Sequence, residues 1–458
     1  MTTTPPNANP GLAPLRPFDR WILRALLVLA ILFGAQVVNR SAFLRLRMTD
    51  AGVFFRAAWA LREGRDIYRT PDDRGWHYLY PSLFAIAMAP LADPPAGEPR
   101  DGYLPYPVSI TLWTALNMAL LWLAAHWLAC AVEESSPSAG PRGPPRFSRW
   151  WWGARVIPIL VCLIAAGSTL SRGQVNILLL LSVSGAALAF VRGNSLRAGL
   201  WLALAAVLKV FPAFLLLYPL IRRDWRCLAG FAIGAAVGML VIPSIVLGPS
   251  QMWALNVDWV QRVILPAFGI ERLGDLADEF HGMEATDNQA FKAVIHSWLH
   301  LGDAAPPAPS PWTRLAHFAL GGAFTLATVL AAGFRKRTPR DTGERTVLTL
   351  GLLACVSLML TPVVHLHYFI LAMPLVSALV IPRMHASPTG ELPAKVWLLA
   401  AAYTAVNLVP RLPWFAETRH LGVATAANIA LWAVGFAAIC RSTKRPPPGL
   451  SLSRTPTE

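Results

Sequence analysis

Long apolar runs, separated by short polar segments, follow one another along most of the chain. A membrane-spanning helix needs about 20 predominantly apolar residues. Runs that approach this length lie at roughly 21–38, 107–132, 155–170, 175–191, 227–247, 312–334, 346–361, 367–382, 396–410 and 421–440. They are too many for one buried core, and they predict an all-α polytopic membrane protein. Because no small-residue cleavage site follows 21–38, we interpret that run as an uncleaved first span.

One further apolar run, from 198 to 221, is interrupted at Lys209-Val210-Phe211-Pro212. It predicts either one span or a hairpin of two short helices, and the proline favours a break because it cannot continue the helical hydrogen-bond ladder. Basic loops of membrane proteins stay in the cytoplasm, and Arg16, Arg20 and Arg24 place the amino terminus there. Only the hairpin then keeps every basic cluster on that side; the clusters lie at 142–155, 192–197, 222–226, 335–340 and 441–445.

This topology predicts about twelve spans with both termini in the cytoplasm. The chain then divides into a cytoplasmic tail at 1–20, a membrane domain at 21–440 and a second cytoplasmic tail at 441–458. Two long segments, about 39–106 and 249–311, face the extracytoplasmic side. Residues 50–63 of the first carry apolar side chains on one helical stripe and charges opposite, which predicts a helix lying along the membrane surface.

Composition excludes several other classes of protein. The 458 residues are 55% hydrophobic and only 14% charged, whereas soluble domains carry about 25% charged residues. The net charge of +15 sits in short loops between apolar runs, which is typical of membrane topology rather than of nucleic-acid binding. The five cysteines are scattered without a CxxC pair, which indicates packing residues rather than disulfides or a metal site.

Asp50 is the first candidate for chemistry, at the start of the helix predicted for 50–63. It has two interpretations. An aspartate there can cap the helix by accepting hydrogen bonds from the free amides of the first turn, although Thr49 could serve as the cap instead. The same carboxylate could act as a general base at the membrane surface.

Two cations stand where membrane proteins rarely place them. Arg172 lies in a four-residue turn between spans, and Lys209 lies inside an apolar run. Either side chain could extend to the interface, or the two could form an anion site, for which phosphate is the obvious membrane-borne ligand. His365 and His367 flank the next outward turn and could add donors; at this spacing they do not share a helical face, so no zinc site is expected.

Uncharged polar and aromatic residues gather on the same predicted side. Gln174 and Asn176 begin an apolar helix and could either bind hydroxyls or cap it. The aromatic residues are typical of the belt at a membrane interface, although such rings also stack on sugars. They are Trp76, Tyr78, Tyr80, Trp113 and Trp253.

Five short motifs, in this order along most of the chain, resemble glycosyltransferase family 87. They are Asp50 with Gly64-Arg65-Asp66-Ile67-Tyr68, then Tyr80-Pro81-Ser82-Leu83-Phe84, Arg172-Gly173-Gln174-Val175-Asn176, Lys209-Val210-Phe211-Pro212 with Arg222-Arg223-Asp224-Trp225-Arg226, and Thr361-Pro362 through His365-Leu366-His367-Tyr368. The chain departs from the family pattern at two places. Ala290 follows Asn288-Gln289 where the family often has serine, and Ser82 follows Pro81 where a second proline is common.

The resemblance implies a GT-C-type helix bundle with an extracytoplasmic active site under the first long loop. The donor would be a hexose, mannose by the best-known family activity, on a polyprenyl phosphate, and the acceptor a lipid or glycan. Membrane lipids, this donor and this acceptor are the expected partners, with no cofactor and no nucleic acid. Asp50 would be the catalytic base of an inverting transfer. The residues expected to bind substrate or phosphate are Tyr80, Arg172, Gln174, Asn176, Lys209, His365 and His367.

A transporter or flippase for a lipid-linked or anionic substrate is the main alternative. Transporters usually show paired hydropathy repeats with broken helices near the membrane midplane. No repeat relates the two halves of this chain, although the break at Lys209 is a feature that transporters use. A second alternative is another enzyme of the same architecture that differs only in its acceptor.

Overall fold

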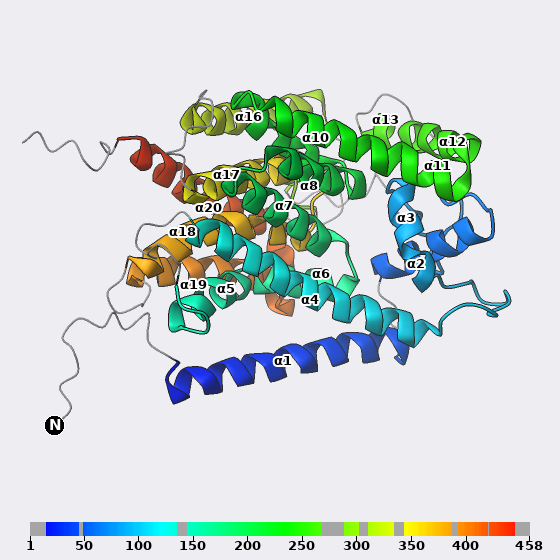
Figure 1. Ribbon diagram of the computed structural model, residues 1–458, viewed down its shortest axis with the longest axis horizontal. Helices are drawn as coiled ribbons and strands as arrows, with labels where there is room; N and C mark the ends of the chain where they lie inside the picture. The colour runs from blue at the N-terminus through cyan, green and yellow to red at the C-terminus, as the bar shows by residue number, and fades with distance from the viewer. Residues whose placement is uncertain are drawn as a thin grey trace, which may run out of the picture.

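The computed structural model describes residues 15–44, 49–134, 144–267, 288–301, 310–333, 343–386, 393–419 and 421–444. Regular structure in these ranges is entirely helical, and no strand occurs in them. The helices run side by side as a bundle, with α2 (Thr49–Arg62) and α3 (Ser82–Met88) at one end of it (Figure 1). The prediction of an all-α polytopic membrane protein is confirmed.

Seven helices in the described ranges are long and apolar enough to cross a membrane. These spans are α1 (Pro17–Ala42), α4 (Tyr106–Glu133), Trp225–Leu247 (α10, Trp225–Ala236; η5, Val237–Val241; α11, Ile242–Leu247), α16 (Pro311–Ala332), α17 (Gly343–Leu360), Leu366–His385 (η9, Leu366–Ala372; α18, Met373–His385) and Val423–Arg441 within α20 (Val423–Lys444). The pair α5 (Arg149–Val161) and α6 (Leu163–Arg172), bent by 68°, makes an eighth if it is one span.

Shorter elements complete the bundle and its ends. They are η2 (Ala89–Leu91), α7 (Asn176–Val191), α8 (Ser195–Leu208), η4 (Phe211–Leu216), α9 (Leu217–Ile221), α12 (Pro249–Trp259), η6 (Val260–Ile264), α13 (Leu265–Ala267), α15 (Phe291–Leu299), α19 (Ala394–Leu408), η10 (Val409–Arg411) and η11 (Pro413–Arg419). The figure of about twelve spans stays a prediction, because several of these helices are too short to be assigned as spans by length.

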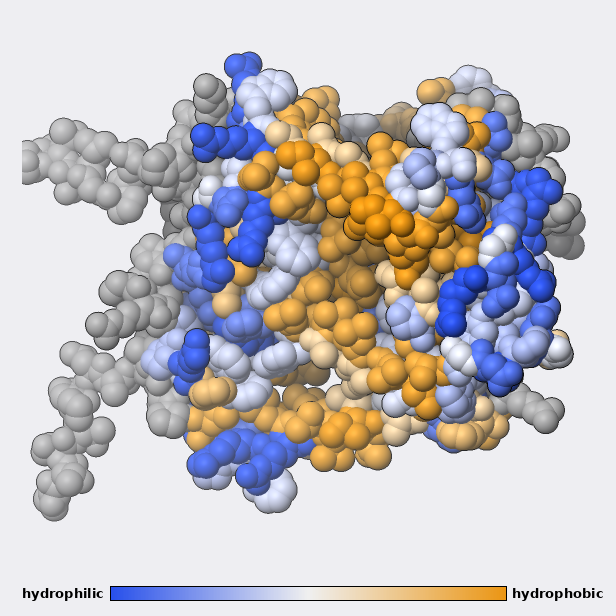
Figure 2. All heavy atoms as spheres, turned by 45° about the vertical axis from the view of Figure 1, so that its right-hand side comes forward, coloured by the Kyte–Doolittle hydropathy of each residue, from blue (hydrophilic) through white to orange (hydrophobic). Residues whose placement is uncertain are grey.

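The outer surface of the bundle is apolar where a membrane would surround it. Figure 2 shows a broad hydrophobic band with hydrophilic side chains toward either end of the molecule. Large apolar side chains of α1 such as Leu29 and Leu32 are exposed. A surface of this kind is stable in lipid, which removes any cost of leaving apolar side chains outside the core.

Close packing between α8 and α10 shows how the chain runs around Lys209. Glycines let the two backbones approach: a Cβ on Gly199 would lie 2.0 Å from the carbonyl oxygen of Cys227. The contacts that these glycines make pair Leu196 with Gly230, Gly199 with Phe231, Ala203 with Gly234 and Val207 with Gly238. Residue numbers rise together along both helices, so the helices are parallel. The chain must therefore reverse between them, and the predicted hairpin at Lys209 is confirmed.

Ion pairs hold helix ends together where α1 begins and α20 ends (Figure 1). Arg155 of α5 is buried and donates to both carboxylate oxygens of Glu133, at 2.9 and 3.0 Å. Two further pairs lie at this end of the bundle, Arg149 with Asp19 at 3.1 Å and Arg192 with Glu134 at 2.6 Å. Basic clusters predicted to share one side of the membrane thus lie at one end of the bundle; the cluster at 335–340 falls outside the described residues.

The first long loop folds over α2 instead of leaving it half exposed. Side chains of α2 from Val53 to Leu61 are all buried, the charged Arg56 among them. Arg56 donates to the carbonyl oxygen of Asp93 at 3.2 Å and to the carboxylate of Asp73 at 2.6 Å. The loop thus supplies partners for the polar face of α2 that periodicity assigns to solvent. That α2 lies along the membrane surface stays a prediction.

Candidate active site

Lys209 ends α8 and places a buried ammonium group between aromatic rings. Its extended backbone (φ −161°, ψ 124°) breaks the helix before Phe211-Pro212. The Nζ atom lies 3.9 Å from the ring centre of Tyr368 and 5.2 Å from that of Tyr80, and it has no hydrogen-bond partner among the described residues. Aromatic faces attract a cation, but a desolvated ammonium group also favours an anion. One interpretation of the sequence was that this side chain extends to the membrane interface. Its ammonium group is buried instead.

Asp50 lies in the first turn of α2. Its negative charge acts on the ammonium group of Lys209 and on the phenols of Tyr80 and Tyr368. These four side chains come from the first long loop, the hairpin turn and the segment after α17. They share one electrostatic environment although they are remote in the sequence.

Tyr80 links the loop to the α6–α7 turn. Its hydroxyl donates to Oε1 of the buried Gln174 at 3.4 Å. Burial, with smaller contributions from Tyr368 and the charge of Asp50, raises the pKa of Tyr80 well above its usual value, so the phenol remains a hydrogen-bond donor. Tyr68 and Tyr78 fix this segment by donating to the carbonyl oxygens of Tyr80 at 3.1 Å and of Pro81 at 2.7 Å.

Trp113 of α4 supports the turn that carries Arg172 and Gln174. Between these two residues the chain adopts a left-handed conformation at Gly173 (φ 68°), which glycine permits without strain. The indole of Trp113 is buried and donates to the carbonyl oxygen of Gly173 at 2.8 Å. Trp113 and Tyr78 are buried, so the prediction that they belong to the aromatic belt at the membrane interface is wrong. Trp76 is exposed, which agrees with that prediction.

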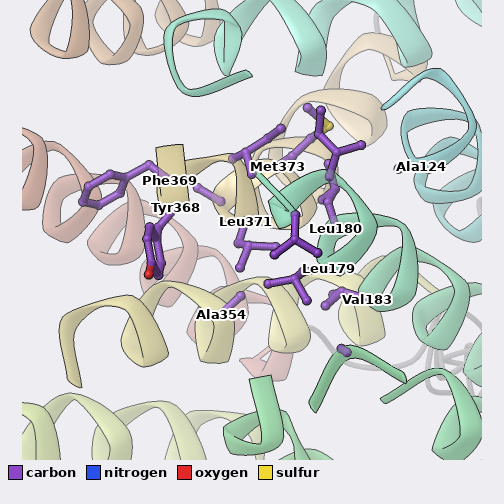
Figure 3. Packing of buried hydrophobic residues seen from close by; sticks show 14 of the residues in the cluster. Ala124, Leu179, Leu180, Val183, Ala354, Tyr368, Phe369, Leu371 and Met373 are labelled. Carbon is purple, nitrogen blue, oxygen red and sulfur yellow. The ribbon is translucent and has the colours of Figure 1, made fainter. Parts of the chain in front are cut away.

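Asn176 holds the backbone of η9 in place. Its Nδ2 atom and the hydroxyl of Thr169 both donate to the carbonyl oxygen of His367, at 3.1 and 3.0 Å. Beyond His367, Leu371 and Met373 belong to the same buried apolar cluster as Leu179 of α7, and Tyr368 turns its hydroxyl away from these side chains (Figure 3). Asn176 therefore fixes the backbone position of His367 and, through it, of the adjacent Tyr368.

The two histidines lie against each other beside Tyr368. The rings of His365 and His367 stack with centroids 5.6 Å apart and planes at 24°. His367 is buried, and its two ring nitrogens have no hydrogen-bond partner in the part of the chain that the structure describes. Positive groups act on it from several elements; they are His365, Lys209, Arg172 and Arg411.

Asn288 and Gln289 explain what the second long loop contributes to this region. Asn288 donates to the carbonyl oxygen of Pro362 at 3.2 Å and accepts from the amide of Val364 at 2.9 Å. The amide of Gln289 donates to the carbonyl oxygen of Val364 at 2.6 Å. The loop thus braces the turn that leads to His365 and His367, and this role does not involve a side chain at the position of Ala290.

Arg172 and His365 line a pocket on which residues from the last part of the chain also converge. Its empty volume is about 390 Å³, part of it open to solvent. The remaining lining residues are Gln289, Leu366, Asn407, Pro410, Arg411, Arg419 and Ala424. Sequence reasoning missed Arg411 and Arg419, because η10 and η11 follow a short apolar helix with no motif or periodicity to draw attention to them. No cluster of side chains able to hold a metal occurs within the described ranges.

Comparison with known proteins gives a family match across this region. The model of glycosyltransferase family 87 matches residues 78–362, more than half of the chain. A polyprenol-phosphate-mannose-dependent alpha-(1-2)-phosphatidylinositol mannoside mannosyltransferase of Mycolicibacterium smegmatis is 26% identical over 415 residues, which cover 88% of this chain and 85% of the relative. No solved structure gives a significant match.

Two mycobacterial relatives match over shorter stretches. A protein of Mycobacterium tuberculosis with the same name as the first relative is 28% identical over 203 residues, 42% of this chain and 45% of its own length. An alpha-(1->3)-arabinofuranosyltransferase of Mycobacterium tuberculosis is 28% identical over 244 residues, 50% of this chain and 49% of its own length. The names of these relatives thus differ in the sugar transferred.

Proposed function

This chain belongs to glycosyltransferase family 87, and from that premise we propose that it transfers a hexose from a polyprenyl-phosphate sugar to a lipid or glycan acceptor. That it is a multi-pass membrane glycosyltransferase follows from the family and from its apolar helices, and this favours catalysis over the transporter alternative. Mannose is the proposed sugar because the relative that covers most of the chain is named for a polyprenol-phosphate-mannose donor.

The proposed active site lies on the extracytoplasmic side, with both termini in the cytoplasm. In support, basic residues such as Arg149 and Arg192 lie at the end of the bundle where α1 begins, and positive loops face the cytoplasm. Asp50 belongs to α2, which lies at the opposite end of the bundle (Figure 1), and its charge acts on Lys209.

The proposed reaction inverts the anomeric centre in one displacement. The acceptor hydroxyl oxygen attacks the anomeric carbon while the bond from that carbon to the donor phosphate oxygen breaks, and its electron pair leaves with the phosphate. Asp50 takes the hydroxyl proton as the new bond forms, a task suited to a positioned carboxylate. Lys209 and the neighbouring cations offset the charge that develops on the phosphate, with Tyr80 as a neutral donor beside them.

One observation carries this assignment: the ammonium group of Lys209 is buried between Tyr80 and Tyr368, within reach of the charge of Asp50. A base and a cation for the leaving group must lie within one substrate length of each other, and these two are close although they are remote in the chain. Tyr80 and Tyr368, on which the charge of Asp50 also acts, lie with their ring centres 5.2 and 3.9 Å from the same ammonium nitrogen.

The test is sugar transfer by the purified chain in liposomes, with a panel of radiolabelled polyprenyl-phosphate sugars and of lipid and glycan acceptors. We expect transfer from the mannose donor by the wild type, with inverted configuration in the product by NMR. Asp50→Asn should lower the rate by at least about 100-fold, since general-base catalysis contributes that much or more. Asp101→Asn, an exposed carboxylate of the same loop, should have no effect.

Two results would contradict the proposal. Undiminished transfer by a folded Asp50→Asn variant would leave that carboxylate with a helix-capping role only. Transfer by the wild type from another sugar donor, and not from the mannose donor, would support a glycosyltransferase but exclude mannose as the transferred sugar.

A further inference from the structure

The pocket beside His365 has features of a binding site in its own right. Its arginines come from two distant parts of the chain, Arg172 from α6 and Arg411 and Arg419 from the segment between α19 and α20. The family match ends at residue 362, so the last two lie beyond it. These two side chains therefore lie outside the part of the chain that the family model matches.

Hydrogen bonds hold both arginines at the pocket. The guanidinium of Arg411 donates to the hydroxyl of Ser168, on α6, at 3.1 Å. Nε of Arg419 donates to the carbonyl oxygen of Pro410 at 2.8 Å. A guanidinium group presents five donors in a planar fork that matches the oxygens of a phosphate, so three arginines that line one pocket favour an anion of this kind there.

Two buried amide oxygens line the same pocket and lack partners. Gln289 and Asn407 are 5% and 3% exposed, and neither Gln289 Oε1 nor Asn407 Oδ1 has a hydrogen-bond partner in the described part of the chain. Their amide nitrogens are already used, by the carbonyl oxygens of Arg419 at 2.7 Å and of Tyr403 at 2.8 Å. Buried oxygens without a donor are costly, and a ligand hydroxyl is the group that would satisfy them.

We propose that this pocket binds a phosphate ester that carries a hydroxyl-rich ring, with the arginines on the phosphate and the two amide oxygens on ring hydroxyls. The inference rests on the proposed function, because both substrates of such a transfer can have this chemistry. The donor has a sugar on its phosphate, and an acceptor can have a polyol headgroup on its own. His365, which lines the pocket and stacks on His367, connects it to the cations around Lys209.

Binding of soluble probes to the full chain in detergent tests the pocket without requiring catalysis. The probes are mannose 1-phosphate for the donor, inositol 1-phosphate for the acceptor and inorganic phosphate, followed by saturation-transfer NMR and titration. We expect Arg411→Gln and Arg419→Gln each to weaken at least one of the ring phosphates about tenfold or more, as loss of a charge-assisted hydrogen bond should. The probe that is affected identifies the source of the phosphate. Arg314→Gln, an exposed arginine at the start of α16, is the matched control.

A second variant separates the two halves of the pocket. Asn407→Leu should weaken the ring phosphates and leave inorganic phosphate unchanged. Arg411→Lys, which keeps the charge but loses the planar fork, replaces Arg411→Gln if that variant does not fold, and should still lose several-fold in affinity.

Three results would overturn the inference: no phosphate probe binds the wild type, binding is equal in the arginine variants and the control, or the ring adds nothing to the affinity of phosphate. The Asp50→Asn variant keeps the outcomes apart, because it should bind the probes as the wild type does. Binding of the probes by a wild type that transfers no sugar would contradict the proposed function, whereas sugar transfer by a wild type that binds no probe in this pocket would contradict the inference alone.

Discussion

The ammonium nitrogen of Lys209 lies 3.9 Å from the ring centre of Tyr368, across a gap of more than 150 residues in the sequence. The cation is buried between this ring and Tyr80, and its hydrogen-bonding capacity is unused among the described residues. Aromatic faces hold such a charge more weakly than a carboxylate salt bridge would. A donor phosphate could therefore recruit it without breaking an ion pair first.

Lys209→Met should remove this charge while preserving most of the side-chain volume. We expect kcat to fall by about 100-fold, as it does when one preorganised group that stabilises transition-state charge is lost, with a smaller change in KM. Steady-state kinetics with the donor varied would measure both. Lys395→Met, at an exposed position of α19, is the control, and equal activity of the two variants would exclude Lys209 from the reaction.

Trp113→Phe should uncouple the α6–α7 turn from α4. The variant loses the 2.8 Å hydrogen bond to Gly173 and leaves that carbonyl oxygen buried without its donor, a cost of about 1–3 kcal/mol. Because Arg172 and Gln174 flank Gly173, substrate affinity should fall together with thermal stability. Melting in detergent and the KM of the donor report the two effects. Trp76→Phe, at an exposed site, should change neither; a loss of stability with unchanged KM would limit Trp113 to a folding role.

Gly199→Ala should force α8 and α10 apart. The added Cβ would meet the carbonyl oxygen of Cys227 at 2.0 Å, a backbone atom that cannot move alone, so we expect a loss of about 3 kcal/mol or more. Gly322→Ala of α16, where no atom lies within 4 Å of the new Cβ, should change stability by less than about 1 kcal/mol. Heat-induced aggregation of the two variants in the same detergent compares them, and equal melting temperatures would show that the helices separate freely.

Sequence patterns predicted the parts of this protein that depend on periodicity and on charge. The apolar runs located the helices, and the placement of basic clusters required the chain to reverse at Lys209, which the parallel packing of α8 and α10 confirms. They also singled out Lys209, because an ionisable residue in an apolar run is conspicuous, and Asp50, because it opens the helix predicted for 50–63.

Features that depend on tertiary contacts could not be predicted from one sequence. Trp113 reads as an interfacial residue because nothing local reveals that its indole meets the carbonyl oxygen of Gly173, 60 residues away. The helical periodicity predicts that Arg56 is on the exposed face of α2. It cannot reveal that Asp73 and Asp93, which bind Arg56, lie in an irregular loop that covers this face. Arg411 has no motif, and only the structure places it beside Arg172.

The glycine-mediated contact of α8 with α10 also limits how the chain can vary in length. Each residue added to a helix turns everything beyond it by about 100° and advances it by about 1.5 Å. The close contact at Gly199 fixes which face of α8 meets α10. An insertion between Gly199 and Lys209 would therefore rotate the ammonium group away from Tyr80 and Tyr368. The nine residues between Gly199 and Lys209 should therefore keep a constant number in any relative that retains both residues.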